Sequence, residues 1–229
     1  ILSFGANCFN IAFILPFTGF FIYKILNKIH LSPFYHKCTI FLSAYISINL
    51  AAFFTALELG IQPLLFVDNL GQPLYCPYPL WISIPAMALS HLTIAGIAEG
   101  LFTLSLYLFI LKTSPNIIYD SQQIKLNSIF SLLAFLIIIS PLGLIAEGTA
   151  WGEWAPEEIL NDTSLGVPLG FIPEKLLNGF NYEAFFPDYT MSGTTDILAY
   201  IASAIIGVAL LIIIFKILGS IIYAKKQSL

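Results

Sequence analysis

Charged side chains are scarce in this chain, and arginine is absent altogether. Charged residues make up 10% of the 229 residues, whereas soluble domains carry about 25%. Hydrophobic residues make up 58%, and the mean hydropathy is +0.88. This composition indicates an integral membrane protein. Without arginine the chain lacks the forked side chain that most often recognises phosphates and base edges, so nucleic-acid binding is not expected.

Cysteines are also few. No two of Cys8, Cys38 and Cys76 form a C-x-x-C motif, which excludes the common zinc and redox motifs, and their odd number argues against a disulfide framework. A bond between Cys8 and Cys76 stays open, because both are predicted on the same side of the membrane. The glycine-rich phosphate loop followed by Lys and Ser or Thr is absent too, so ATP hydrolysis would belong to another protein.

Long apolar runs, by contrast, are abundant. Five stand out by length, at residues 4–26, 39–59, 82–111, 126–147 and 196–223. A helix needs about 20 apolar residues to cross a bilayer, and none of these runs carries the polar stripe of a surface helix. The predicted fold class is therefore an all-α, polytopic transmembrane bundle with five spans in this chain.

The links between the runs alternate in charge. Lysines flank the first and third links and lie near the C-terminal end of the chain: Lys24, Lys28, Lys37, Lys112, Lys125, Lys216, Lys225 and Lys226. Acids gather in the fourth link: Glu153, Glu157, Glu158, Asp162, Glu174, Glu183 and Asp188. The excess of lysine on the cytoplasmic side places the C-terminus inside and residues 148–195 outside. We therefore divide the chain into a membrane core of four spans (1–147), an extracytoplasmic segment (148–195), and a final span with a cytoplasmic tail (196–229).

The extracytoplasmic segment is rich in aromatic residues, such as Trp151 and Trp154, which are typical of a membrane interface. Two short helices are expected in it, one from Pro156 and one between Pro173 and Gly179, because proline suits the first turn of a helix and glycine its end. We expect a lid-like segment that lies against the outer face.

Two ionisable side chains, His91 and Glu99, fall inside the third run. On a regular helix they lie on neighbouring parts of one face, roughly 12 Å apart along the axis. Ionisable groups inside a membrane are costly unless they are paired or face a cavity. Two interpretations remain open: a hydrogen-bonded pair that fixes helix packing, or a path or site for a cation.

Small residues recur every four positions on three of the runs, which is typical of close helix contacts in lipid. They are Ser43, Ser47, Ala51 and Thr55 on the second, Gly96 and Gly100 on the third, and Ala199, Ser203 and Gly207 on the fifth. In the lysine-rich first link, His30 and His36 are expected to be solvated and to have no further role.

Motifs along nearly the whole chain stand in a recognisable order. They are Gly-Ala-Asn-Cys-Phe-Asn at 5–10, Glu-Leu-Gly-Ile-Gln-Pro at 58–63, then Met87, His91, Gly96, Glu99, Gly100 and Thr103, and finally Pro-Leu-Gly at 141–143 and Gly-Thr-Ala-Trp-Gly-Glu-Trp at 148–154. In order and spacing they resemble the CbiM/NikM family. These proteins are the substrate-binding membrane (S) components of cobalt and nickel energy-coupling factor (ECF) transporters, a class of ABC transporter.

The resemblance implies a permease component for uptake of Co²⁺ or Ni²⁺ in the cytoplasmic membrane of a prokaryote. Its implied partners are a transmembrane coupling (T) protein, cytoplasmic ATP-binding subunits and a small auxiliary membrane subunit. In the family the metal is held by the N-terminal amine, a histidine at position two and a histidine in an early loop. These segments have no counterpart here, so we expect an N-terminally truncated member without the primary metal ligands and with no tightly bound cofactor.

Four residues remain as candidates for orienting groups or for the ion path: Asn7, Asn10, His91 and Glu99. The two asparagines either orient a metal-binding group or satisfy backbone groups at a helix end. Glu58 and Glu147 either attract cations to the entrance or are solvated helix ends. An alternative function is an intramembrane enzyme or a proton-conducting subunit that uses His91 and Glu99, although the His-Glu-x-x-His spacing is absent.

Overall fold

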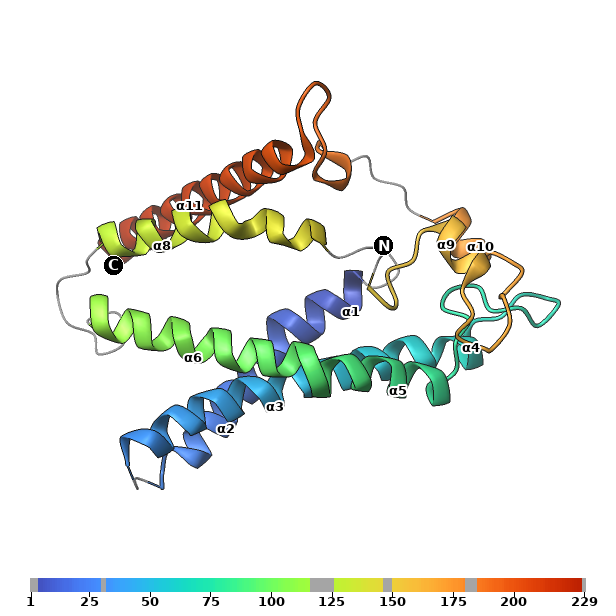
Figure 1. Cartoon of the computed structure of the whole chain (residues 1–229), viewed down its shortest axis with the longest axis horizontal. Helices are drawn as coiled ribbons and strands as arrows, with labels where there is room; N and C mark the ends of the chain where they lie inside the picture. The colour runs from blue at the N-terminus through green and yellow to red at the C-terminus, as the bar shows by residue number, and fades with distance from the viewer. Residues whose placement is uncertain (1–3, 30–31, 116–125, 146–149, 180–184, 228–229) are drawn as a thin grey trace. The chain divides into compact units, whose positions relative to one another are not determined.

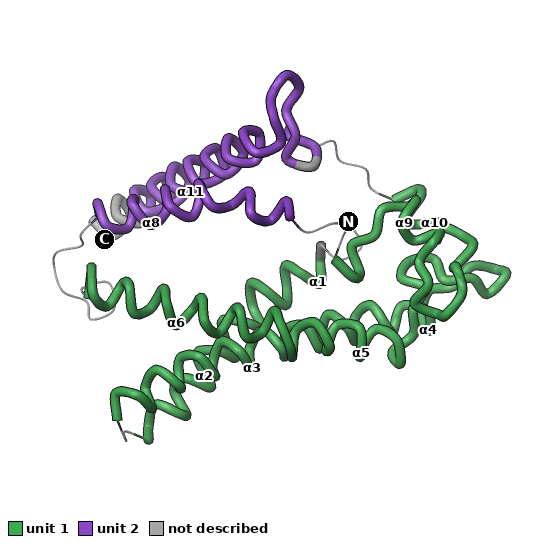
Figure 2. Tube along the Cα trace, viewed as in Figure 1, with its two compact units in different colours: residues 1–120, 149–181 green, residues 121–148, 182–229 purple. Residues whose placement is uncertain are grey.

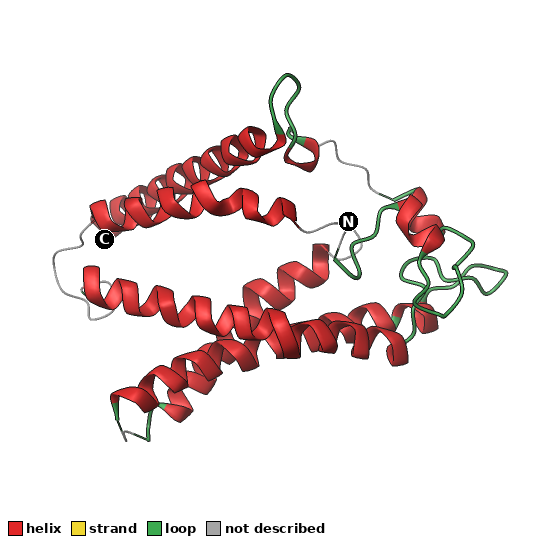
Figure 3. Ribbon diagram, in the orientation of Figure 1, coloured by secondary structure: helices red, strands yellow, loops and turns green. Residues whose placement is uncertain are grey.

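The computed structural model describes residues 4–29, 32–115, 126–145, 150–179 and 185–227 (Figure 1), and within these ranges it contains helices and loops but no β-strand (Figure 3). Five stretches are long and apolar enough to cross a membrane: Gly5–Leu26, Pro33–Leu65, Leu80–Thr113, Leu126–Ile145 and Asp196–Ile221. The predicted all-α, polytopic fold with five spans is confirmed.

The chain divides into two compact units (Figure 2). Unit 1 comprises residues 1–120 and 149–181, and unit 2 comprises residues 121–148 and 182–229. The division predicted from the sequence, into residues 1–147, 148–195 and 196–229, describes which side of the membrane each segment lies on. It does not describe how the segments pack, and it stays a prediction. All four candidate residues, Asn7, Asn10, His91 and Glu99, belong to unit 1.

The first span of unit 1 is a helix with one widened turn. It consists of α1 (Phe4–Phe9), a π-helical turn η1 (Asn10–Ile14) and α2 (Leu15–Leu26). The backbone N–H of Leu15 donates to the carbonyl of Asn10, five residues back, instead of four. Pro16 follows directly and has no N–H to donate, which disturbs the regular hydrogen-bond ladder at this point. π-Helical turns of this kind occur frequently at functional sites.

The second span, α3 (Pro33–Gly60), is the centre of unit 1. Its first turn is capped by Ser32, whose side chain accepts a hydrogen bond of 3.2 Å from the backbone N–H of Tyr35. The predicted row of small residues is buried along it: Ser43, Ser47, Ala51 and Thr55. These short side chains let α2 and the third span approach α3 closely, and the prediction of a helix contact here is confirmed.

The third span consists of α5 (Leu80–Ser90), a second π-helical turn η2 (His91–Ala95) and α6 (Gly96–Thr113). Here the N–H of Gly96 donates to the carbonyl of His91. A Cβ atom on Gly96 would lie 2.6 Å from Asn49 Nδ2, and one on Gly100 would lie 2.6 Å from a carbon of the Phe41 ring. Both glycines are therefore required for the close packing of α6 on α3, as predicted.

Short elements cover the end of unit 1 where α3 stops. They are α4 (Gln62–Leu65), α9 (Pro156–Asn161) and α10 (Glu174–Leu177), and the two short helices expected after residue 148 are confirmed. The backbone N–H of Lys175 donates to the carbonyl of Leu74 at 2.9 Å. This bond ties the later segment to the loop between the second and third spans. The position of the segment as a lid over the outer face stays a prediction.

Unit 2 consists of α8 (Leu126–Ile139), the 3-10 turns η3 (Ser140–Ile145) and η4 (Pro187–Tyr189), and α11 (Asp196–Gln227). The ring of Tyr189 stacks edge-on against Tyr200 of α11, with the ring centroids 5.1 Å apart. Ala199 is buried, but a Cβ on Gly207 would meet no atom of the described residues within 4 Å. A close helix contact at Gly207 therefore stays a prediction.

Candidate functional site

The most buried polar group of the first span is the side chain of Asn10, which is fully buried. Its amide nitrogen Nδ2 donates to Thr55 Oγ1 at 3.0 Å and to Glu58 Oε2 at 2.8 Å. The Glu58 carboxylate offers only lone pairs, and Thr55 already gives its own proton to the carbonyl of Ala51 at 3.1 Å. The group that faces both must therefore be the nitrogen of Asn10, which fixes the orientation of the amide.

The other half of the same amide, Asn10 Oδ1, has no hydrogen-bond partner within the described ranges. A buried carbonyl without a partner costs about 1–3 kcal/mol. Asn10 begins the π-helical turn, and its side chain faces α3. The same amide that leaves Oδ1 without a partner holds the carboxylate of Glu58 through Nδ2.

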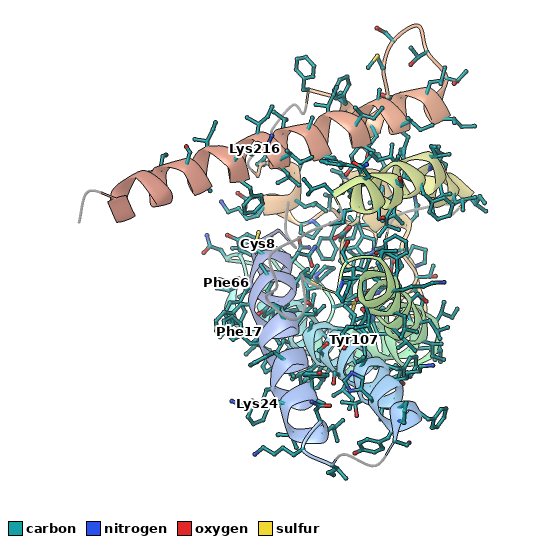
Figure 4. All side chains as sticks on the ribbon, turned by 90° about the vertical axis from the view of Figure 1, so that its left-hand side faces the viewer. Cys8, Phe17, Lys24, Phe66, Tyr107 and Lys216 are labelled. Carbon is teal, nitrogen blue, oxygen red and sulfur yellow. The ribbon has the colours of Figure 1, made fainter. Side chains whose placement is uncertain are left out.

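A second asparagine stands three residues earlier. Asn7 donates through Nδ2 to Glu153 Oε1 at 2.8 Å, across 146 positions of sequence. Residues three apart lie on one face of a helix, so Asn7 and Asn10 hold two carboxylates from distant elements along the same face of the first span. Figure 4 shows this end of the span at Cys8, and the opposite end at Lys24.

His91 begins the π-helical turn of the third span. Its Nδ1 lies 2.9 Å from the carbonyl of Met87 and 3.1 Å from Ser90 Oγ, which itself donates to the same carbonyl. A carbonyl can only accept, so Nδ1 carries the proton. In the tautomer with this proton, Nε2 is the nitrogen that carries the lone pair. This is the tautomer in which metal-binding histidines are held, with the other nitrogen donating to a carbonyl or carboxylate.

Glu99 lies two turns further along the same span. Thr103 donates to its Oε1 at 3.1 Å, and the side chain is half-buried. Glu99 also lines a cavity of about 370 Å³ between α2, α3 and α6. The other lining residues are Leu15, Pro16, Gly19, Phe20, Tyr23, Ile40, Ser43, Ala44, Ser47, Thr103 and Tyr107.

His91 and Glu99 share no hydrogen bond in the part of the chain that the structure describes, because each is bonded to its own neighbours. They nevertheless lie on one face. The π-helical turn between them takes up one extra residue, so the step of eight residues corresponds to about seven of a regular helix, or close to two full turns. The predicted shared face holds, while a direct bond between the two side chains does not form.

His36 was expected to be solvated, and this expectation is wrong. Its Nδ1 lies 3.0 Å from Asn27 Oδ1, and its Nε2 lies 3.1 Å from the hydroxyl of Tyr107. The ring joins the end of the first span to α3 and α6, at the end of unit 1 that carries Lys24 and Lys112. The sequence carries no signal for these bonds, because the partners lie nine and 71 positions away and meet His36 only through the packing of the helices.

An aromatic cluster anchors the segment after residue 148 to the loop before α5. Tyr78 is fully buried, and its ring centroid lies 5.8 Å from that of Trp151 and 5.1 Å from that of Trp154. Its hydroxyl donates to Asp162 Oδ1. Burial and this neighbouring carboxylate raise the pKa of Tyr78. Burial disfavours the charged form of Asp162, but hydrogen bonds from Ser164 and Tyr78 stabilise that form and lower the pKa of Asp162.

The cysteines are free thiols, so the bond left open between Cys8 and Cys76 does not form. Cys76 is buried beside Tyr78, and this burial raises the pKa of its thiol to about 11. Within the described ranges, no three His, Cys, Asp or Glu side chains gather as a metal ion would require.

Comparison with known proteins covers both parts of the chain. The cobalt uptake substrate-specific transmembrane region, CbiM, matches residues 1–117, and the PDGLE domain matches residues 126–224. The first boundary between unit 1 and unit 2, between residues 120 and 121, lies in the interval between these two matches.

Two curated relatives match over most of the chain. The probable fused nickel transport protein LarMN of Lactiplantibacillus plantarum is 38% identical over 217 residues, which are 94% of this chain and 65% of that protein. The fused nickel transport protein NikMN of Rhodobacter capsulatus is 35% identical over 228 residues, 93% of this chain and 66% of that protein. The chain thus spans just under two-thirds of the length of these relatives. The crystal structure of a transition metal transporter matches 52% of this chain and 52% of its own, at 44% identity and a TM-score of 0.46.

Proposed function

Because this chain belongs to the CbiM family of cobalt uptake substrate-specific transmembrane regions, we propose that it is the substrate-binding membrane component of an uptake system for Co²⁺ or Ni²⁺. The names of its relatives, which are nickel transport proteins, support this proposal. The observation that carries the proposal at the level of residues is the buried amide of Asn10, which holds the carboxylate of Glu58 at one end of the bundle.

That end is the outer one in the proposed topology. Asn7, Asn10, Glu58 and Glu153 lie together at the start of the first span, while Lys24 and Lys112 stand at the opposite end of their helices. The excess of lysine at that opposite end supports a cytoplasmic position for it, and by the same alternation a cytoplasmic C-terminus. The membrane is proposed to be the cytoplasmic membrane of a prokaryote.

The two carboxylates form the proposed mouth for the ion. Carboxylates lining an entrance raise the local concentration of cations and speed their arrival. The amide nitrogens of Asn7 and Asn10 fix one oxygen of each carboxylate without neutralising its charge, since an amide is itself uncharged. The mouth therefore keeps a negative field that attracts a divalent cation.

His91 supplies the proposed nitrogen group further along the route. Imidazole nitrogen suits Ni²⁺ and Co²⁺, and the hydrogen bond from Nδ1 to Met87 leaves the lone pair of Nε2 for such a contact. His91 acts in this proposal as a transient contact rather than as part of a closed site. An enzyme or a proton-conducting subunit is not favoured, because the relatives are transport proteins.

ATP hydrolysis is proposed to come from cytoplasmic ATP-binding subunits, joined to this protein through a transmembrane coupling protein and accompanied by a small auxiliary membrane subunit. The test is metal accumulation, measured by elemental analysis in cells that lack the gene and in the same cells with the gene restored. We expect cobalt, nickel or both to accumulate only when the gene is present. Equal accumulation in both strains, with the neighbouring transport genes intact, would overturn the proposal.

A further inference from the structure

The π-helical turn of the third span, η2, has no local cause in the sequence. In the first span, Pro16 follows the π-helical turn and removes a helix donor. The segment that contains η2 and continues it, His-Leu-Thr-Ile-Ala-Gly-Ile-Ala-Glu-Gly at 91–100, has no proline. π-Helical turns are rare, so the reason for this one lies in its contacts with another helix.

One carbonyl loses its helix donor in this turn. In an α-helix the N–H of Gly96 would donate to the carbonyl of Leu92, four residues back, but here it donates to His91. The hydroxyl of Tyr45, on α3, donates to the Leu92 carbonyl at 2.9 Å. Lipid offers no water to satisfy a freed backbone group, so this bond from α3 offsets the cost of the turn.

Packing on the ring of Tyr45 aims its hydroxyl at this carbonyl. The ring stacks on that of Phe41, one turn earlier on α3, with the ring centroids 6.1 Å apart and the planes 12° apart. The backbone of Gly96 also lies against it, because a Cβ on Gly96 would come within 3.0 Å of Tyr45 Cδ2. The donor is therefore held in place by two contacts besides its own hydrogen bond.

The turn determines the directions of His91 and Glu99. Each residue of an α-helix rotates the side chains by about 100°, so a regular step of eight residues would leave them about 80° apart around the axis. The extra residue of the π-helical turn reduces this step to about seven regular residues, and the offset falls to about 20°. The two side chains share one face because the turn is present.

We propose that Tyr45 is a positioning residue for His91. Its hydroxyl replaces the helix donor at Leu92 and so maintains the turn that directs His91 to the same face as Glu99. This inference rests on the proposed contact of His91 with the transported ion. The turn itself can be observed without any ion, so the two proposals are tested separately.

The first test observes the Leu92 carbonyl by NMR, with the full chain in lipid bilayers. Leu92–Thr93 is the one Leu-Thr pair in the sequence, so ¹³C at leucine carbonyls and ¹⁵N at threonine amides label a single coupled pair. Tyr45→Phe keeps the ring and removes only the hydroxyl, and it should shift the Leu92 signal upfield, as a carbonyl carbon does when it loses a donor. Tyr107→Phe is the matched control: it removes the hydroxyl that bonds His36 and should leave the signal in place.

The second test measures the initial rate of cobalt and nickel uptake in cells. Tyr45→Phe should lower this rate by up to roughly fivefold, the factor by which one neutral hydrogen bond shifts an equilibrium. Added to His91→Ala, the same substitution should cause no further loss, because a residue that acts through His91 then has nothing left to position. A residue that only stabilises the fold would lower the rate in both backgrounds.

Four results would each overturn the proposal: an unmoved Leu92 signal in Tyr45→Phe, an equal shift in Tyr107→Phe, an unchanged uptake rate in Tyr45→Phe, or a further loss when Tyr45→Phe is added to His91→Ala. Uptake that His91→Ala alone leaves unchanged would overturn the contact of His91 with the ion, and the positioning role with it. That failure is recognisable, because the Leu92 signal still reports whether Tyr45 holds the turn.

Discussion

Asn10 on the first span donates a hydrogen bond of 2.8 Å to the carboxylate of Glu58, which lies 48 positions later near the end of the second span. The same nitrogen bonds Thr55, one turn away from Glu58 on α3. One buried amide thus joins two spans and fixes an acidic side chain at the mouth of the bundle. This arrangement makes the asparagine both a packing residue and a positioning residue.

Replacing Asn10 by alanine should destabilise the protein. The substitution removes both hydrogen bonds and leaves Glu58 without its donor, which costs about 1.5–3 kcal/mol for a bond to a charged group. Thermal unfolding of the purified protein in detergent measures the effect. Asn69→Ala is the matched control, because Asn69 is exposed on the loop before α5. Equal melting temperatures for the two variants would contradict the role of Asn10.

Replacing Gly96 by alanine should loosen the contact between α3 and α6. The added Cβ would meet Asn49 and the backbone of the π-helical turn at His91, and overpacking of this kind costs about 1–3 kcal/mol. Gly207→Ala in α11 adds the same methyl group at a position where no atom of the described residues lies within 4 Å. Thermal unfolding should therefore separate the two variants, and an equal effect would show that Gly96 is not tightly packed.

Cys76 should be unreactive toward N-ethylmaleimide at neutral pH. Burial raises the pKa of its thiol from 9.0 to about 11, which lowers the thiolate fraction about a hundredfold and with it the rate of reaction. Rates are compared in variants that keep a single cysteine, either Cys76 or the exposed Cys8. We expect Cys8 to react much faster, and Cys76 to gain reactivity as the pH rises toward 11. Equal rates at neutral pH would mean that the cluster around Tyr78 is open.

Acid should loosen the segment that Tyr78 anchors. The folded protein lowers the pKa of Asp162 below its ordinary value of 3.8. The charged carboxylate therefore contributes stability above pH 3.8, and this contribution is lost as the pH falls through the lower folded value. The fluorescence of Trp151 and Trp154, measured in Trp81→Phe protein, reports the opening. Asp162→Asn should remove this pH dependence, and an unchanged acid transition in that variant would contradict the assignment.

The sequence predicted the five spans because long apolar runs are a direct consequence of bilayer thickness. It also predicted the close contact at Gly96 and Gly100, since small residues at four-residue spacing have few other uses in lipid. The two π-helical turns, which begin at Asn10 and at His91, could not be predicted. Each inserts one extra residue into its helix, and the apolar pattern of the sequence, read with 3.6 residues per turn, gives no sign of such an insertion.

The sequence could not predict which groups would form hydrogen bonds with the polar side chains. Asn10 and His91 stood out as polar residues near or within apolar runs, but nothing in the chain indicated Glu58 as the partner of Asn10. His36 shows the same limit: beside lysines it resembles a solvated residue, yet it joins Asn27 to Tyr107. Such bonds depend on how helices cross, which is a property of tertiary packing.

In the proposed uptake of Co²⁺ or Ni²⁺, Glu58, held by Asn10, forms part of the mouth that collects the ion. This role is tested by the initial rate of cobalt and nickel uptake at low metal concentration, compared between Glu58→Gln and Glu157→Gln. Glu157 is an exposed carboxylate on α9, so its loss changes the net charge by the same amount. We predict that Glu58→Gln lowers the initial rate by up to roughly tenfold, the low end of the rate enhancement that a charged cleft provides, and that Glu157→Gln leaves it close to wild type. Equal rates in the two variants would contradict the account.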